Sequence, residues 1–217
     1  MSSPPLVAHP AAPVAPRHVV EALLQVVTPH LSDNLQRLCG IVGLQRFHTA
    51  RKLVGTAATV KTRPGDNLAI YKALMDLQPG CVLVVDGGGD VTNALIGELI
   101  LLYAQQRGCA GFVVDGAIRD SAAFRDADFP CYARAVSHRG PYKNGPGEIN
   151  VPVCIGGQVV QPGDLVVGDE DGLVIFAQSE APRLLEAAAR SAAKEAEIRA
   201  EIATGRVEQS WLRAVGL

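Results

Sequence analysis

The chain has 217 residues, of which 48% are hydrophobic and 19% are charged, and its formal net charge is −2 at pH 7. This length and composition suit a single large domain with a substantial core, and we expect one domain rather than two small ones. A charge so close to neutral gives no general attraction to phosphate backbones or anionic lipid, which argues against nucleic acid as a direct ligand.

The first seventeen residues have the composition of a flexible leader. The stretch "MSSPPLVAHPAAPVAPRH" lacks the basic start and continuous apolar segment of a signal peptide, and its prolines argue against regular structure. Two helical pieces follow within residues 19–38, where Val, Leu and Ile have helical spacing and Thr28-Pro29 and Ser32-Asp33 punctuate the pattern.

The middle of the chain alternates strands and helices. "LVGTAATVKT" (53–62) predicts a strand from its Val and Thr content, and Asp66 in the next turn can cap a helix over residues 68–77. A buried strand and a glycine-rich loop follow in "QPGCVLVVDGGGD", then a helix that ends at Gly108 and the strand "GFVVDG". This order predicts an α/β fold.

After Phe124 the pattern changes to short β-rich runs broken by glycine and proline. Gly156-Gly157 and Asp171-Gly172 are expected hairpin turns, so an antiparallel or mixed sheet should close the core. We therefore expect one α/β domain over residues 18–178.

Residues 179–217 form a separate extension. An Ala-rich helix is expected from Ser179, as N-cap, to Gly205, as the stop. Charged residues surround this helix on most sides, so it is either a solvated surface element or one that reaches another subunit.

The cysteines and histidines show no metal-ligand pattern. The five cysteines are an odd number, widely spaced and without a CxxC pair, which favours buried reduced thiols in a cytoplasmic protein over disulfides or zinc. No apolar stretch reaches the roughly twenty residues of a membrane span, so we expect no membrane partner. The cysteines are Cys39, Cys81, Cys109, Cys131 and Cys154.

The stretch "VVDGGGDVTNALIGEL" (84–99) carries one candidate site. Its glycines fit neither G-x-G-x-x-G nor a P-loop, which argues against a nucleotide. One alternative is a loop where backbone passes close to backbone. Another is an anion site, because residues 97–100 open a helix whose free N–H groups can bind a carboxylate. That site would lie beside Arg119 and Asp120 if the two loops meet at one sheet edge.

The stretch "GFVVDGAIRDSAAF" (111–124) places Asp115, Arg119 and Asp120 after a buried strand. One interpretation is structural, since such residues end strands and form surface ion pairs. The other is functional. Asp120 could hold Mg²⁺, which needs few protein ligands, and the guanidinium fork of Arg119 could hold an α-keto acid bound to that metal.

These two stretches and "INVPVCIGGQVVQPGDLVVGDEDGLVIF" (149–176), in this order, resemble the family of the regulator of ribonuclease activity A and the class II 4-hydroxy-4-methyl-2-oxoglutarate aldolases, over approximately residues 31–211. The resemblance implies that Asp120 is the metal ligand and Arg119 the substrate arginine. It implies that Glu98 helps to hold a catalytic water. Its carboxylate-binding loop corresponds to Gly97, Glu98, Leu99 and Ile100.

The same resemblance implies a role for the C-terminal helix. In the aldolase branch, the Glu of a Lys-Glu pair enters the neighbouring subunit's site, and Glu195 matches it here, with Glu197 and Glu201 as alternatives. The fold implied is an α/β/β sandwich of the phosphohistidine swivelling-domain type, assembled as a trimer or a dimer of trimers.

Two functions follow from the resemblance. One is an Mg²⁺- or Mn²⁺-dependent retro-aldol lyase that acts on a keto acid and yields pyruvate, with oxaloacetate decarboxylation as a related reaction. The alternative is a non-catalytic protein that binds and inhibits a ribonuclease or helicase. The helix beyond Ser179 favours the aldolase, because compact regulators end near the last strand.

Overall fold

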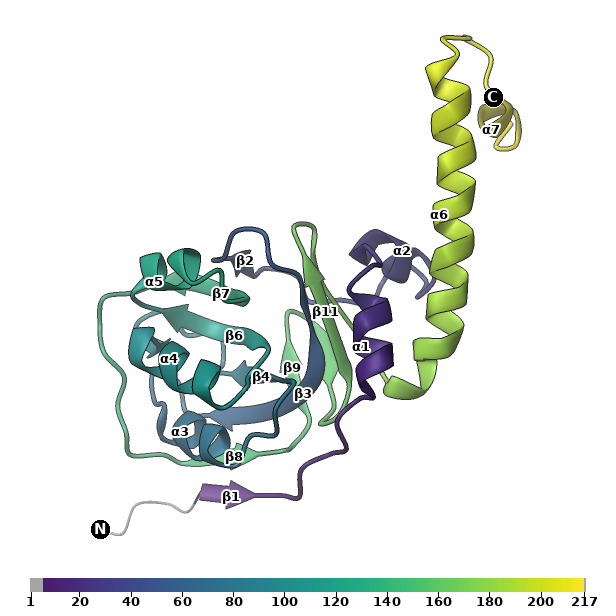
Figure 1. The fold of residues 1–217 in the computed structure, drawn as a ribbon. Helices are drawn as coiled ribbons and strands as arrows, with labels where there is room; N and C mark the ends of the chain where they lie inside the picture. Colours follow the sequence, from purple (N-terminus) through teal and green to yellow (C-terminus); the bar gives the residue numbers. More distant parts are fainter. Residues whose placement is uncertain (1–5, 217) are drawn as a thin grey trace.

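A mixed sheet of ten strands organises the chain, for which the computed structural model describes residues 6–216 (Figure 1). Its strands are β1 (Leu6–Ala8), β2 (Gln45–Arg46), β3 (Leu53–Thr62), β4 (Cys81–Asp86), β5 (Ala94–Ile96), β6 (Gly111–Ile118), β7 (Cys131–Val136), β8 (Gly147–Ile149), β11 (Leu165–Asp169) and β12 (Gly172–Phe176). Two further strands, β9 (Val153–Ile155) and β10 (Gln158–Val160), form a separate antiparallel hairpin. The helices are α1 (Arg17–Leu23), α2 (Thr28–Asp33), α3 (Leu68–Met75), α4 (Glu98–Gln106), α5 (Ser121–Asp126), α6 (Ala181–Ala203) and α7 (Ser210–Arg213).

Four parallel strands, β3, β4, β6 and β7, form the centre of the sheet. On the edge that faces away from β4, β3 pairs antiparallel with β11 along its first half and with β8 along its second half. β4 and β6 are buried along almost their whole length, in keeping with their near-continuous apolar sequences. The expected α/β order, closed by a mixed sheet, is confirmed.

Hydrophobic side chains fill both faces of the sheet. Leu83 and Val85 belong to a cluster shared with α3 and α4, whereas Val82 and Val84 belong to a cluster shared with the β9–β10 and β11–β12 hairpins. A third cluster, which includes Leu184, joins the β11–β12 hairpin to α1, α2 and α6. Consequently α3, α4 and α5 lie on one side of the molecule and α1, α2 and α6 on the other (Figure 1).

The expected leader without regular structure is wrong for residues 6–8. β1 pairs in parallel with β8, and the Ala15 amide donates to Thr56 Oγ1 at 2.9 Å. The prolines flank the paired residues instead of interrupting them, and a strand at a sheet edge needs no N–H donor on its outer side. Residues 1–5 of the leader lie outside the described residues.

Several boundaries differ from expectation by a few residues. Thr28-Pro29 begins α2 and does not separate the two N-terminal helices, since proline suits the first turn of a helix. The β9–β10 turn falls on Gly156-Gly157 as predicted, but the β11–β12 turn falls on Glu170-Asp171, one residue early. β5 and α5 were not predicted, because three and six residues are too few to show a period.

The C-terminal helix α6 has 23 residues, and its distal part extends away from the rest of the chain (Figure 1). It stops before Gly205, as predicted, and Gly205 has the left-handed φ of +70°. Ser179 is not its N-cap, because Gln178–Glu180 form a 3₁₀ turn first. Across residues 6–216, no helix is both long and apolar enough to cross a membrane.

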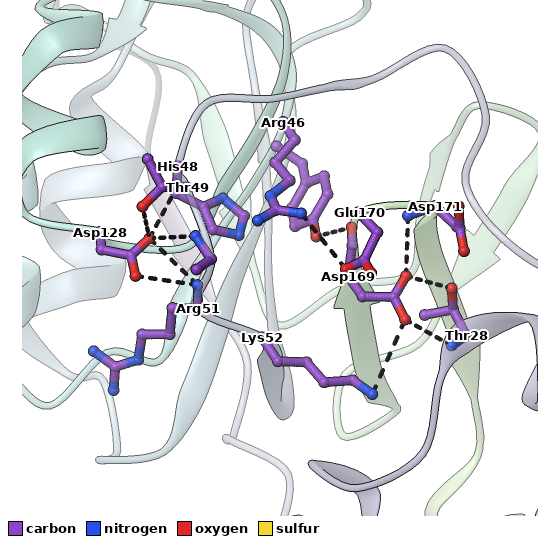
Figure 2. A network of polar contacts seen from close by, with 12 residues as sticks. Thr28, Arg46, His48, Thr49, Arg51, Lys52, Asp128, Asp169, Glu170 and Asp171 are labelled. Atoms are coloured by element: carbon purple, nitrogen blue, oxygen red, sulfur yellow. Dashed lines mark hydrogen bonds and ion pairs between the residues drawn. The ribbon is translucent and has the colours of Figure 1, made fainter.

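A buried carboxylate ties α2 to the sheet (Figure 2). Asp169 is 6% exposed and accepts hydrogen bonds from the Thr28 amide at 2.7 Å, the Thr28 hydroxyl at 2.6 Å and the Asp171 amide at 3.1 Å. Lys52 Nζ lies 4.0 Å from the same carboxylate. Burial of this charge is tolerated because donors and a cation surround it, and the first turn of α2 is thereby fixed to the end of β11.

His48 lies on the left of Figure 2, across from Asp169. His48 Nδ1 lies 3.0 Å from the Cys131 amide, which can donate to it, and 3.3 Å from the Cys131 carbonyl, to which it can donate in the other tautomer. Burial lowers the pKa of His48, and the nearby Arg46 guanidinium lowers it further. Beside it, the Thr49 hydroxyl and three backbone amides donate to Asp128 and lower the pKa of that carboxyl to about 2.

His48 should make the protein less stable as the pH falls. Its folded-state pKa lies below the ordinary value of 6.5, so the unfolded chain binds more protons near that pH and stability is lost on acidification. Urea midpoints measured between about pH 7.5 and about pH 5.5 should fall less in His48→Gln than in the wild type. The exposed His18 provides the control, and a pH dependence of His48→Gln equal to that of His18→Gln would contradict the prediction.

Candidate functional site

The two sequence stretches with candidate residues meet because β5 pairs with the end of β6. The pairing is parallel, with Ile96 opposite Ile118, and the Arg119 amide donates to the Ile96 carbonyl at 2.9 Å. The residues that follow, Gly97 and Arg119, therefore leave the sheet side by side. The condition set by the sequence, that the two loops share one sheet edge, is met.

Asp120 links the two loops. Its Oδ2 accepts a hydrogen bond from the Glu98 amide at 3.0 Å, and Arg119 Nε lies 3.6 Å from the same oxygen. The backbone of Asp120 has φ 54° and ψ 42°, a left-handed conformation that costs free energy for a residue with a Cβ. Strain of this kind, held in place by the surrounding structure, is typical of functional sites.

Gly97 permits the close approach of these side chains. A Cβ on residue 97 would lie 2.6 Å from Asp120 Oδ2 and 2.9 Å from Arg119 Cγ, both closer than van der Waals contact. The φ of Gly97 is −144°, which any residue can adopt. Glycine is therefore needed here for space and not for conformation.

The start of α4 offers fewer free donors than the sequence suggested. The Glu98 amide is already bonded to Asp120, and the Ile100 amide donates to the Gly97 carbonyl at 3.1 Å. In the described part of the chain, the Leu99 amide has no such partner and remains for an anion. The Leu99 side chain is 75% exposed, so water and small solutes reach this point.

A pocket adjoins the loop and contains residues that the sequence did not single out. Asn67 is 2% exposed, and its Nδ2 donates to the Leu95 carbonyl at 2.9 Å while its Oδ1 has no partner within residues 6–216. Lys143 Nζ lies 5.8 Å from the centre of the Tyr71 ring. Both residues line this pocket together with Arg119.

No local signal could have found Lys143 or Asn67. Lys143 lies in an irregular segment, and that segment reaches the site through a bridge between Asp66 and Tyr142. Asn67 occupies the residue before α3, where a helix cap explains it equally well. Asp115, by contrast, is buried and paired with Arg134 of β7, so it belongs to the structure of the sheet.

Glu195 does not reach this site within one chain. It lies on α6, on the opposite side of the molecule from α4 and α5 (Figure 1), where His30 Nε2 is 3.1 Å from its Oε1. Of the alternatives, Glu201 accepts hydrogen bonds from the Ser210 amide at 2.7 Å and hydroxyl at 2.6 Å, which lower its pKa. Glu197 is exposed.

The donor set suits a hard divalent cation held by few protein ligands. Within residues 6–216, no group of three or more His, Cys, Asp or Glu side chains could hold a metal ion. Asp120 keeps one carboxylate oxygen, Oδ1, clear of the hydrogen bond from Glu98, and its side chain is 46% exposed. One carboxylate oxygen, waters and a substrate satisfy Mg²⁺, so Asp120 fits this role.

The fold and site define a mixed α/β protein with an arginine, a carboxylate and a helix N-terminus at one sheet edge. The model of the RraA-like family, described as Aldolase/RraA, matches residues 28–175. The chain belongs to this family, and the resemblance seen in the sequence is confirmed.

Some relatives of the chain are named as aldolases and others as RraA-type inhibitors. A protein of Halalkalibacterium halodurans named "Putative 4-hydroxy-4-methyl-2-oxoglutarate aldolase" is 40% identical over 169 residues, which cover 77% of this chain and 80% of that protein. The structure of the RNA-processing inhibitor RraA from Thermus thermophilis has a TM-score of 0.65 at 33% identity, with 70% of this chain and 93% of that one covered. RraAS2 of Streptomyces coelicolor, described as an unusual member of the RNase ES inhibitor RraA family, has a TM-score of 0.79 at 28% identity, with 85% and 98% covered.

Gly97→Ala should disrupt the site and leave the fold intact. The new Cβ must push Asp120 and Arg119 aside, and both side chains are partly exposed, so they can shift toward solvent once the hydrogen bond to Glu98 breaks. We expect the Glu98 amide to exchange with solvent at least about tenfold faster, because its hydrogen bond to a carboxylate is lost. The melting temperature should change by less than about 3 °C.

Amide exchange followed by NMR, together with thermal unfolding, gives both readouts. Leu99→Ala is the matched control, since its side chain is 75% exposed at the same turn. An unchanged Glu98 amide in Gly97→Ala would mean that the loop accepts a Cβ and that the close packing is not required.

Proposed function

We propose that this chain is a divalent-metal-dependent class II aldolase that cleaves 4-hydroxy-4-methyl-2-oxoglutarate, or a related 4-hydroxy-2-oxo acid, to pyruvate. The observation that carries the proposal is the convergence of Arg119, Asp120 and the N-terminus of α4 at one sheet edge. The name of the Halalkalibacterium halodurans relative supports the same substrate class.

Each residue has a chemical task in this proposal. Asp120 would hold Mg²⁺ or Mn²⁺, and the bound cation would supply Lewis-acid stabilisation of negative charge on the substrate oxygens. Arg119 would bind those oxygens with parallel N–H donors. The Leu99 amide, at the start of α4, would bind the substrate carboxylate.

The bond changes balance without an oxidant. The C3–C4 bond breaks, C4 becomes a carbonyl as its hydroxyl gives its proton to the water that Glu98 would hold, and the bonding electrons pass into the pyruvate enolate. C3 then takes up a proton, and Glu98, exposed beside Asp120, would hold the water that delivers it. Decarboxylation of oxaloacetate would use the same enolate, with carbon dioxide as the leaving fragment.

The pocket next to the loop favours a substrate with a second polar end. Lys143 adds a cation, and Asn67 Oδ1 adds an acceptor without a partner in the described chain. A dicarboxylic acid whose 4-hydroxyl donates to Asn67 would satisfy both. This arrangement supports a 4-hydroxy-2-oxo dicarboxylate over a simple monocarboxylate.

We also propose a shared site in a homo-oligomer, either a trimer or a dimer of trimers. Glu195 would enter the neighbouring subunit's site, since it cannot meet Arg119 within its own chain. The fold would be of the phosphohistidine swivelling-domain type, with the helical extension from residue 179. All five cysteines are free thiols, which supports a cytoplasmic location.

The second candidate is a non-catalytic regulator that binds and inhibits a ribonuclease or helicase. The likeness to the Thermus and Streptomyces inhibitors favours it. The Thermus inhibitor matches 70% of this chain, so a larger part of the chain has no counterpart in it. The Streptomyces protein matches 85% of this chain and therefore differs less from it in extent. The C-terminal helix alone is therefore not decisive, and activity is the test.

Pyruvate release should require a divalent cation and Asp120. A coupled assay on a panel of 4-hydroxy-2-oxo acids and oxaloacetate should give turnover with Mg²⁺ or Mn²⁺ and none after chelation. Asp120→Asn should weaken metal binding, whereas Asp126→Asn, an exposed carboxylate on α5, should not. Full activity in metal-free buffer would refute the requirement for a divalent cation. A failure to release pyruvate from any substrate would favour the non-catalytic regulator.

Arg119→Lys should lower kcat/KM by at least about a hundredfold, because an ammonium cannot reproduce the two parallel hydrogen bonds of a guanidinium. A loss of about 3 kcal/mol in transition-state stabilisation is typical when one aimed donor is removed. Arg125→Lys, an exposed arginine on α5, is the control and should be near normal. Near-normal kcat/KM in Arg119→Lys would make Arg119 a surface residue.

A further inference from the structure

The C-terminal helix leaves the body of the chain close to Glu195. The first part of α6 is packed, with Leu184 and Ala188 buried, whereas residues 192–197 are all exposed. In the described chain, the contact between Glu195 and His30 of α2 is the last polar contact between α6 and the domain before the helix projects away (Figure 1). It therefore sits where the direction of the helix is set.

His30 is the more buried of the two partners of this carboxylate. Its Nε2 lies 3.1 Å from Glu195 Oε1, and only 13% of its side chain is exposed. The other partner, Arg199, donates to Oε2 at 3.3 Å, but its side chain is 80% exposed. An exposed ion pair one helical turn away contributes little to the orientation of Glu195.

The helix that carries His30 is itself held in place. Its first turn is bonded to the buried Asp169 through the Thr28 amide and hydroxyl. Its end is joined to α6 through Asn34, whose Nδ2 donates to the His30 carbonyl at 2.8 Å and to Ser191 Oγ at 3.1 Å. The imidazole is thus fixed to the sheet while it contacts the outer part of α6.

We propose that His30 is a positioning residue that holds the Glu195 carboxylate in one orientation, so that one subunit presents it to the Arg119–Asp120 site of a neighbouring copy. This inference rests on the proposed function, because it takes Glu195 as the acid that completes that site. His30 itself does not touch the substrate. It acts by limiting the rotamers of a side chain that is otherwise half exposed.

The first test separates positioning from simple stability. His30→Ala should lower kcat by about tenfold or more, the scale seen when a partner that orients a site residue is removed, with KM changed less than about threefold. His30→Gln, whose amide can donate in place of Nε2, should recover most of kcat. Amide exchange in residues 196–203 should become faster in His30→Ala.

Two controls share the same surroundings. Arg199→Ala removes the other partner of Glu195, and Asn34→Ala removes the neighbouring polar contact between α2 and α6. Both should keep near-normal kcat and leave exchange in residues 196–203 close to that of the wild type. A loss of kcat in Asn34→Ala as large as that in His30→Ala would mean that His30 only helps to dock the two helices.

The second test asks in which subunit His30 acts. Arg119→Ala and Glu195→Ala chains, each inactive alone, should regain activity when refolded together, since some sites then pair an intact Arg119 with an intact Glu195. Adding His30→Ala to the Arg119→Ala chain, which donates Glu195, should lower the regained activity by about tenfold. Adding it to the Glu195→Ala chain should have little effect.

The outcomes distinguish the inference from the function beneath it. If no activity returns although mass measurement shows exchanged subunits, the shared site is wrong and the inference falls with it. If activity returns equally wherever His30→Ala is placed, the shared site stands and His30 does not position Glu195. An equal loss in both placements would assign His30 to stability alone.

Discussion

The parallel pairing of β5 with the end of β6 is the constraint on which the candidate site depends. It sets Ile96 opposite Ile118, so that Gly97 and Arg119 leave the sheet together. The backbone of Asp120 then adopts a left-handed conformation, and its carboxylate accepts a hydrogen bond from the Glu98 amide at 3.0 Å. The free energy of this strained residue is offset by the strand pairing and by that hydrogen bond, which fix the carboxylate at the start of α4.

The two parts of the proposed site lie on opposite sides of the molecule. Arg119 and Asp120 follow the central sheet beside α4 and α5, whereas Glu195 lies on α6 beyond the β11–β12 hairpin (Figure 1). A surface that must meet a different surface of an identical chain forms a head-to-tail contact, and such contacts close into rings when the rotation allows. The proposed shared site would therefore favour a cyclic oligomer.

Burial and hydrogen bonding distinguish the structural carboxylate from those proposed for function. Asp169 is 6% exposed, and its hydrogen bonds to Thr28 and Asp171 are complete, so it holds α2 in place. Asp120, by contrast, is half exposed and has a strained backbone. Glu195 has a partner on each carboxylate oxygen, but it lies where α6 leaves the domain and becomes exposed to solvent. Buried charge is satisfied within the chain, and the carboxylates proposed for chemistry keep access to water and ligands.

The sequence by itself determined the elements with a clear period and the family. The strand at residues 53–62, the α/β order and the helix that ends before Gly205 follow from local pattern, and motif order led to the RraA-like family. Only the tertiary structure decided the rest. β5 is three residues long and exists because β6 lies beside it, and Asn67 and Lys143 enter the pocket through contacts between distant segments. The place of Glu195 beside His30 likewise depends on the packing of α2 against α6, since residues so far apart in the chain share no local pattern that a sequence can display.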